Sequence, residues 1–213
     1  RQMCIRDRAG GDPRKIPVDA QQAPNFVHFD LPYAYRYEYG EDNLLKDAVA
    51  SLERQIEYEG PGTIAAILLE GESGTSGCLQ YPKGYLKKVR EICNKHGILL
   101  IMDEVMSGFG RTGKWFGFQN HDIIPDMIVM AKGLTCGYLP LGCVMVSEKI
   151  ASKYDDAVLP LGLTYSAHAV SCAAAMEVIR IYEEDHLIER AAEMGKYLES
   201  RIEEMKKIHP SIG

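Results

Sequence analysis

Two short apolar runs in the middle of the chain each end in a single charged residue. Residues 98–103 end in Asp103, and residues 127–132 end in Lys132. Apolar runs of this length, bounded by glycine or charge, are typical of strands that are buried on both faces of an α/β sheet. Ligands of open α/β sheets bind outside the carboxyl ends of the strands, so we expect Asp103 and Lys132 to face one crevice.

Helical periodicity and strand-like runs alternate along the rest of the chain. Asp42 has the residue type of a helix N-cap, and Gly97 has the type that ends a helix. This alternation predicts an α/β fold with a mostly parallel sheet flanked by helices, incomplete at both ends. The expected helices cover about 42–58, 82–96, 167–183 and 187–207, and the further strands cover 63–70 and 143–146.

Composition narrows the functional classes. The 213 residues carry a formal net charge of −6, which argues against a nucleic-acid surface, and no apolar run approaches the ~18 residues of a membrane span. The six cysteines are irregularly spaced without a CxxC pair, so we expect free thiols, largely buried, in a reducing compartment and place the protein in the cytoplasm. The histidines lack zinc-binding spacing, and no metal is expected.

An amine and a carboxylate that meet in one crevice suit few chemistries as well as that of pyridoxal phosphate (PLP). The amine of Lys132 can form a Schiff base with the aldehyde of this cofactor. The carboxylate of Asp103 can hold the pyridine nitrogen protonated, which keeps the ring able to accept electrons. The two strand ends therefore predict a PLP site.

Three ordered motifs carry a resemblance to a known family. Residues 103–113 read Asp-Glu-Val-Met-Ser-Gly-Phe-Gly-Arg-Thr-Gly, residues 131–134 read Ala-Lys-Gly-Leu, and residues 162–168 read Gly-Leu-Thr-Tyr-Ser-Ala-His. They closely resemble the signatures of the class III aminotransferases, which are PLP enzymes of fold type I. The resemblance extends over residues 9–213.

The resemblance implies a division of the chain. It makes residues 9–165 part of the PLP-binding large domain. Residues 166–213 would be closing helices that lead into a small C-terminal domain, which this sequence lacks. Residues 1–8 fit no periodic pattern, and we expect them to be a non-native scar.

The resemblance also implies roles for single residues. Lys132 would bind the cofactor as a Schiff base and shuttle a proton, Asp103 would pair with the pyridine nitrogen, and Val105 would pack on the ring. Thr164 would donate its hydroxyl to the cofactor phosphate of the neighbouring subunit, which implies a homodimer with shared active sites. Glu104 belongs to the motif without an agreed chemical role.

Substrate preference follows from weaker features of the same resemblance. Glu70 would gate dicarboxylate substrates, but Gly71 stands where many relatives have proline, and Met106 stands where many have glutamine. Residues 69–78 resemble the branch that acts on ω-amino donors such as taurine. The implied reaction is ping-pong transfer of an amino group from an amino acid or ω-amino donor to a 2-oxo acid such as pyruvate or 2-oxoglutarate.

Three alternatives remain open on the sequence. A glutamate-1-semialdehyde aminomutase-like enzyme would share the fold and the lysine. A catalytically incomplete fragment is the second, because the family's phosphate-binding turn precedes the matched segment. A P-loop NTPase is the third, since residues 108–114 fit G-x-x-x-x-G-K, although Trp115 stands where Ser or Thr is needed.

Overall fold

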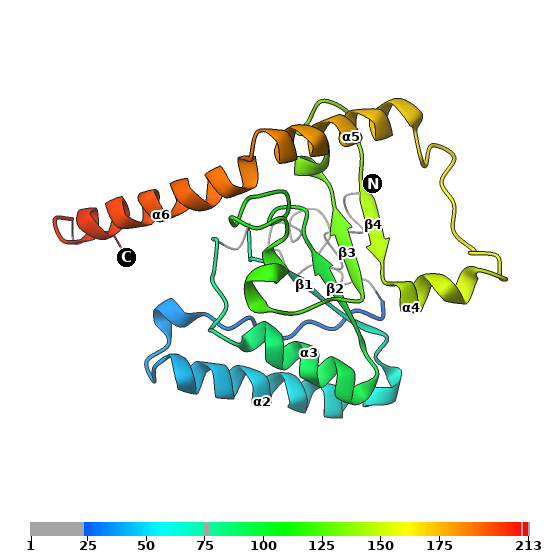
Figure 1. The fold of residues 1–213 in the computed structure, drawn as a ribbon. Helices are drawn as coiled ribbons and strands as arrows, with labels where there is room; N and C mark the ends of the chain where they lie inside the picture. The colour runs from blue at the N-terminus through cyan, green and yellow to red at the C-terminus, as the bar shows by residue number, and fades with distance from the viewer. Residues whose placement is uncertain (1–23, 75–76, 210, 213) are drawn as a thin grey trace.

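The fold is built on a four-stranded sheet with the strand order β1-β2-β3-β4 (Figure 1). The structure, a computed structural model, describes residues 24–74, 77–209 and 211–212, so the expected scar at residues 1–8 lies outside the described residues. β1, β2 and β3 are parallel, and β4 is antiparallel to β3. The strands are β1 (Ala66–Glu70), β2 (Leu99–Asp103), β3 (Met127–Met130) and β4 (Cys143–Val146).

Two amphipathic helices cover one side of the sheet. α2 (Glu41–Glu59) and α3 (Tyr85–His96) lie side by side there (Figure 1). Burial along α3 follows the helical period, and Gly97 ends the helix in the left-handed conformation, as expected. The buried residues of α3 are Tyr85, Leu86, Val89, Ile92 and Cys93.

The C-terminal half of the chain runs past the strand ends. After the short α4 (Glu148–Ala151), a long segment leads to α5 (Ala169–Glu184), which passes the ends of β3 and β4 (Figure 1). α6 (Leu187–Lys206) continues away from the sheet, and Ile188 is its one buried residue within the described part of the chain. Short 3₁₀ turns are η2 (Ala34–Arg36), η3 (Pro61–Thr63), η4 (Gly117–His121), η5 (Lys132–Leu134) and η6 (Ser152–Tyr154).

Strands, helices and the mostly parallel sheet agree with the expected fold class, but three details were wrong. Asp42 lies in the first turn of α2, and Gly40 occupies the N-cap. The strands are not buried on both faces: burial alternates along β1, β2 and β3, and all four residues of the edge strand β4 are exposed. The thiols are not largely buried: among the described cysteines Cys93 is buried as expected, Cys172 is half-buried, and Cys78, Cys136 and Cys143 are exposed.

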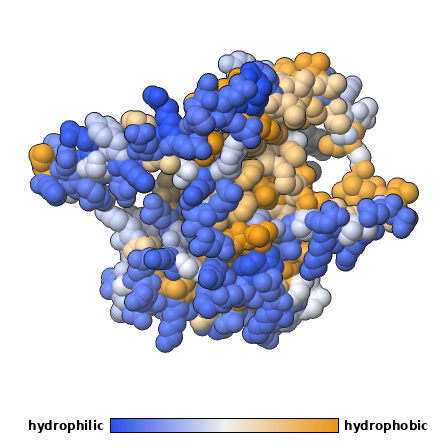
Figure 2. Space-filling model, in the orientation of Figure 1, coloured by the Kyte–Doolittle hydropathy of each residue, from blue (hydrophilic) through white to orange (hydrophobic). Residues whose placement is uncertain are grey.

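The uncovered side carries apolar side chains. Val144 of β4 is 60% exposed and Val170 of α5 is 61% exposed. Figure 2 shows apolar residues gathered on this face beside α5 and β4. Contiguous apolar surface of this kind marks a face that another part of a protein covers.

Within the described residues, no helix combines the length and the apolar character needed to cross a bilayer.

Candidate active site

The carboxyl ends of the three parallel strands bring the predicted residues together. Glu70 and Asp103 are register partners at the ends of β1 and β2. Asp103 also lies opposite Val129 of β3, and Lys132 follows three residues after Val129. The structure thus gathers Glu70, Asp103 and Lys132 at one edge of the sheet, where ligands of such sheets bind.

Asp103 is half-buried, and its carboxylate shapes the turn that follows β2. Its Oδ1 accepts a hydrogen bond from the backbone N–H of Val105 at 2.9 Å. Within the described part of the chain, Oδ2 of Asp103 has no hydrogen-bond partner. It can therefore accept a hydrogen bond from an N–H or O–H group of a ligand. Val105, also half-buried, is held beside Asp103 by this bond.

Lys132 begins the turn η5 with an exposed side chain. Its φ of +43° is left-handed, a conformation that costs a non-glycine residue about 1 kcal/mol or more. The turn is closed by bonds from Leu134 N to the Ala131 carbonyl (3.0 Å) and from Thr135 N to the Lys132 carbonyl (3.2 Å). Strained backbone of this kind clusters at functional sites, and here it redirects the chain directly after β3.

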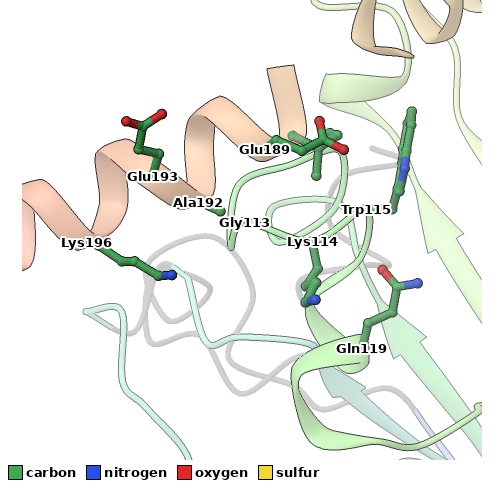
Figure 3. Close-up of a pocket in the computed structure, with 9 residues that line it drawn as sticks. Gly113, Lys114, Trp115, Gln119, Glu189, Ala192, Glu193 and Lys196 are labelled. Atoms are coloured by element: carbon green, nitrogen blue, oxygen red, sulfur yellow. The ribbon is translucent and has the colours of Figure 1, made fainter. Parts of the chain in front are cut away.

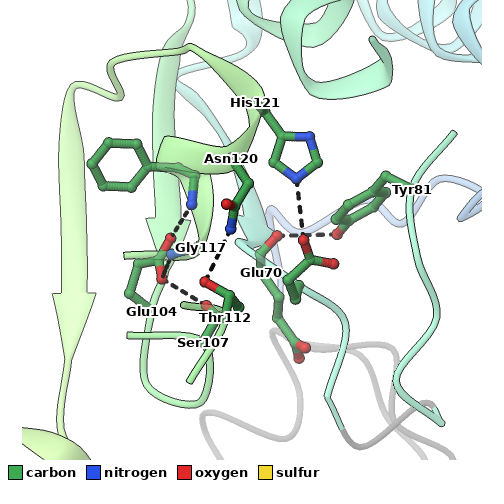
Figure 4. A network of polar contacts seen from close by, with 10 residues as sticks. Glu70, Tyr81, Glu104, Ser107, Thr112, Gly117, Asn120 and His121 are labelled. Atoms are coloured by element: carbon green, nitrogen blue, oxygen red, sulfur yellow. Dashed lines mark hydrogen bonds and ion pairs between the residues drawn. The ribbon is translucent and has the colours of Figure 1, made fainter. Parts of the chain in front are cut away.

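Glu104 is fully buried behind this edge and ties the following loop together (Figure 4). Its Oε2 accepts from the Ser107 hydroxyl (2.6 Å) and Gly117 N (2.8 Å), and Oε1 accepts from Phe118 N (2.9 Å). Burial raises the pKa of Glu104, and these three hydrogen bonds partly offset that rise. A charged residue directly after a buried strand, with serine three residues later, was the only sequence signal for this role.

Glu70 is engaged by its own loop. Its Oε2 accepts from Gly74 N, and its backbone carbonyl accepts the Tyr81 hydroxyl at 3.1 Å. Nearby, His121 Nε2 lies 3.3 Å from Glu72 Oε1 (Figure 4). Glu70 therefore stabilises the loop after β1, and the proposed gating of substrates stays a prediction.

Thr164 is not part of the strand-end group. It is exposed, in the segment between η6 and α5. Among the described residues, no hydrogen bond joins Thr164 to Asp103 or Lys132. Thr164 is therefore not among the residues that the strand ends bring together.

A surface pocket of about 530 Å³ lies elsewhere, between α6 and the loop before η4 (Figure 3). Lys114 and Trp115 line it from the loop, and Glu193 and Lys196 line it from α6. None of the predicted site residues lines this pocket. We therefore place the candidate site at the strand ends.

Residues 108–114 do not form a phosphate-binding P-loop. The N–H of Phe109 donates to the Trp115 carbonyl (2.6 Å), and that of Gly110 donates to the Lys114 carbonyl (3.2 Å). These amides are therefore not directed at a phosphate. The 3₁₀ turn η4, rather than an α-helix, follows this loop, so the helix N-terminus that a P-loop needs is missing here.

The sequence model of the aminotransferase class III family matches residues 13–213. The chain belongs to the class III aminotransferases. It is 40% identical to the putrescine–pyruvate aminotransferase of Pseudomonas aeruginosa, over 89% of this chain and 42% of that protein. It is 36% identical to the taurine–pyruvate aminotransferase of Bilophila wadsworthia, over 90% of this chain and 43% of that protein.

An aminotransferase of known structure shares the fold. The taurine:2-oxoglutarate aminotransferase from Bifidobacterium kashiwanohense, solved with PLP and glutamate, superposes with a TM-score of 0.91 at 43% identity. The match covers 95% of this chain and 46% of that one. The resemblance and the fold class expected from the sequence are thus confirmed, and the chain spans less than half the length of the relatives it matches.

Proposed function

We propose that this chain is part of a PLP-dependent aminotransferase. The observation that carries the proposal is the delivery of Asp103 and Lys132 to one edge from the adjacent parallel strands β2 and β3. The donor set fits the cofactor: Oδ2 of Asp103 is available to a pyridine N–H, and the exposed Lys132 amine is available to an aldehyde. Family membership supports the same reading.

Each residue has a distinct task in this proposal. Bound PLP supplies an electron sink that makes the donor's α-hydrogen acidic. Lys132 would hold the cofactor through its amine and would then move the proton at the donor carbon. Asp103 keeps the pyridine nitrogen protonated, and Val105 packs on one face of the ring. The amino group is transferred in two half-reactions, first from the donor and then to a 2-oxo acid.

The proposed donors are ω-amino compounds. Residues 69–78 carry the resemblance to this branch, and residues 75 and 76 of that stretch lie outside the described residues. Relatives named for putrescine and taurine support the choice of donor, with pyruvate or 2-oxoglutarate as acceptor. Glu70 would contribute to substrate selection beside Asp103.

The proposed assembly is a homodimer in which Thr164 completes the partner's site. Thr164 is exposed and lies outside the strand ends that carry Asp103 and Lys132, as a residue that serves a neighbouring subunit would. The apolar face beside α5 and β4 supports burial by another part of the assembly. The free state of the described cysteines supports a reducing compartment, and we place the enzyme in the cytoplasm.

Reductive trapping tests the central claim. The complete protein that carries these residues is loaded with PLP, and its absorbance near ~400 nm is recorded before borohydride reduction and peptide mapping. The label is expected on Lys132, and the band is expected to be lost in Lys132→Ala. A label on Lys114 or Lys149 would overturn the assignment.

A further inference from the structure

The turn that carries Lys132 is held from outside by one side chain of α5. The Tyr182 hydroxyl donates a hydrogen bond to the backbone carbonyl of Gly133 at 2.9 Å, across 49 residues of sequence. The bonds within the turn join its own residues to one another. The bond from Tyr182 ties the turn to a separate element, the helix α5.

The Tyr182 ring is itself fixed by two aromatic neighbours. It stacks on Phe109, with ring centroids 6.0 Å apart and planes at 22°, and it meets the edge of Trp115 at 5.9 Å. Such aromatic pairs contribute beyond their buried area. The phenol oxygen therefore has a defined position from which to hold the Gly133 peptide.

Phe109 packs closely against the same residue, Gly133. A Cβ added to Gly133 would lie 2.7 Å from the Cβ of Phe109, closer than side chains pack. Gly133 thus has Phe109 packed against its Cα and the Tyr182 hydroxyl bonded to its carbonyl oxygen. Because Lys132 is the preceding residue, these two contacts restrict the direction in which its side chain leaves the backbone.

We propose that Tyr182 is a positioning residue for Lys132, acting through the Gly133 carbonyl. The inference rests on the proposed role of Lys132. Tyr182 does not reach the reacting atoms. It holds the peptide from which the amine is delivered, and a misdirected amine loses near-attack geometry.

The Tyr182 hydroxyl also contacts Cys136, and the effect of this contact has to be distinguished from that of the bond to Gly133. The Cys136 thiol lies 3.0 Å from the Tyr182 oxygen. Burial, followed by the contact with Cys136, raises the pKa of Tyr182, so the phenol stays protonated and can donate at any working pH. The test therefore has to remove the hydroxyl and the thiol independently.

The principal variant is Tyr182→Phe in the complete, PLP-loaded protein, with Tyr85→Phe as the matched control. Tyr182→Phe keeps the ring contacts and removes only the hydroxyl. Tyr85 is fully buried, and its hydroxyl has no hydrogen-bond partner among the described residues. Tyr85→Phe therefore also removes a tyrosine hydroxyl, but at a position where no hydrogen bond is lost. Cys136→Ala removes the thiol, together with its long 3.8 Å contact to the Gly133 carbonyl, and leaves the bond from Tyr182 to Gly133 in place.

Two readouts besides turnover are measured. The first is the pH titration of the absorbance band near ~400 nm, which reports the environment of the lysine–cofactor bond. The second is amide hydrogen exchange of Leu134 and Thr135 in the cofactor-free protein. For Tyr182→Phe we expect a shifted titration, exchange faster by roughly tenfold, and kcat lower by on the order of tenfold, the loss that a small misplacement produces. Tyr85→Phe and Cys136→Ala should match the wild type.

Each other outcome is informative. If Tyr182→Phe leaves titration and exchange unchanged, or if Cys136→Ala reproduces its effects, the positioning role is overturned while trapping at Lys132 still stands. If Tyr182→Phe fails to fold, the hydroxyl supports the whole fold and the specific role is likewise overturned. If the wild type is not trapped at Lys132, the proposed function fails, and this result is visible without any Tyr182 variant.

Discussion

Arg90 of α3 and Asp126, directly before β3, form an ion pair in which Nη1 lies 2.6 Å from Oδ2. The same oxygen accepts a hydrogen bond from Leu100 N of β2 at 2.8 Å. Both charged side chains are only 14% exposed, so solvent screens the pair weakly. One carboxylate thus joins α3, β2 and the entry to β3, at the opposite end of the strands from the candidate site.

Asp126→Asn is expected to destabilise the fold by about 1–2 kcal/mol. The variant removes the charge that Arg90 pairs with, while the amide oxygen can still accept from Leu100 N. Glu53→Gln is the matched control, because Glu53 and Lys95 form an exposed pair at 3.6 Å that should contribute less than about 0.5 kcal/mol. Chemical denaturation of both variants measures the difference, and equal effects would contradict the prediction.

The contribution of Asp126 should depend on pH. Burial raises its pKa, but the hydrogen bonds from Leu100 and Arg90 and the charge of Arg90 outweigh this effect, so the pKa lies below 3.8. The stabilisation is therefore present above pH 3.8 and is lost as the pH falls through the folded-state pKa. The gap in unfolding free energy between wild type and Asp126→Asn should shrink in that acid range. A gap that grows there would show that another group is responsible.

Glu104→Leu should be more harmful than Glu104→Gln. The leucine leaves the Ser107 hydroxyl and the N–H groups of Gly117 and Phe118 without their acceptor, and we expect a loss of about 3 kcal/mol in unfolding free energy. Glutamine keeps one acceptor oxygen, so its loss should lie between wild type and leucine. Denaturation curves give the order, and two equal losses would show that volume rather than hydrogen bonding decides.

Asp103→Asn tests the pyridine partner. The neutral amide can no longer hold the pyridine nitrogen protonated, so proton abstraction from the donor should slow by several orders of magnitude while PLP still binds. Single-turnover absorbance with excess donor measures the step, and retention of the bound cofactor is the internal control. Equal rates in variant and wild type would remove Asp103 from the proposed mechanism.

Mixed dimers test the shared site. Thr164→Ala should weaken PLP binding by about 10- to 150-fold, the equivalent of 1.5–3 kcal/mol for one hydrogen bond to a charged group. Mixing Lys132→Ala and Thr164→Ala subunits at limiting PLP creates one doubly altered site and one intact site per mixed dimer. Activity should therefore partly return. If mixed dimers form without recovery, Thr164 does not act across the subunit boundary.

Local patterns were sufficient for the elements and for the meeting of Asp103 and Lys132 at one edge of the sheet, whereas their roles stay predictions. The strands that end at Asp103 and near Lys132 are short apolar runs, and parallel strands place their carboxyl ends together whatever packs around them. The N-cap of α2 lies two residues before the predicted one, because Gly40 occupies the position expected for Asp42. Sequence signals locate helix ends only to within a few residues.

Contacts between residues far apart in the sequence could not be predicted from local patterns. Tyr182 lies on an ordinary amphipathic helix, and nothing local indicates that its hydroxyl meets Gly133 49 positions away. The exposure of β4 was missed for a related reason: an apolar run shows that a strand can be buried, but not which segment covers it. Thr164 illustrates the same limit, since its proposed partner belongs to another copy of the chain.

The close packing of α6 on the loop before η4 has a mechanical consequence. A Cβ on Gly113 would lie 2.9 Å from that of Ala192, so the first turns of the helix rest directly on the loop backbone. The 20 residues of α6 extend about 30 Å, and a tilt of roughly 10° at its base would displace the far end by about 5 Å. Phe109, which packs on Gly133 beside Lys132, belongs to the same loop. α6 is thus packed against the same loop that supplies the contact of Phe109 with Gly133, so the helix and the turn that carries Lys132 share one structural support.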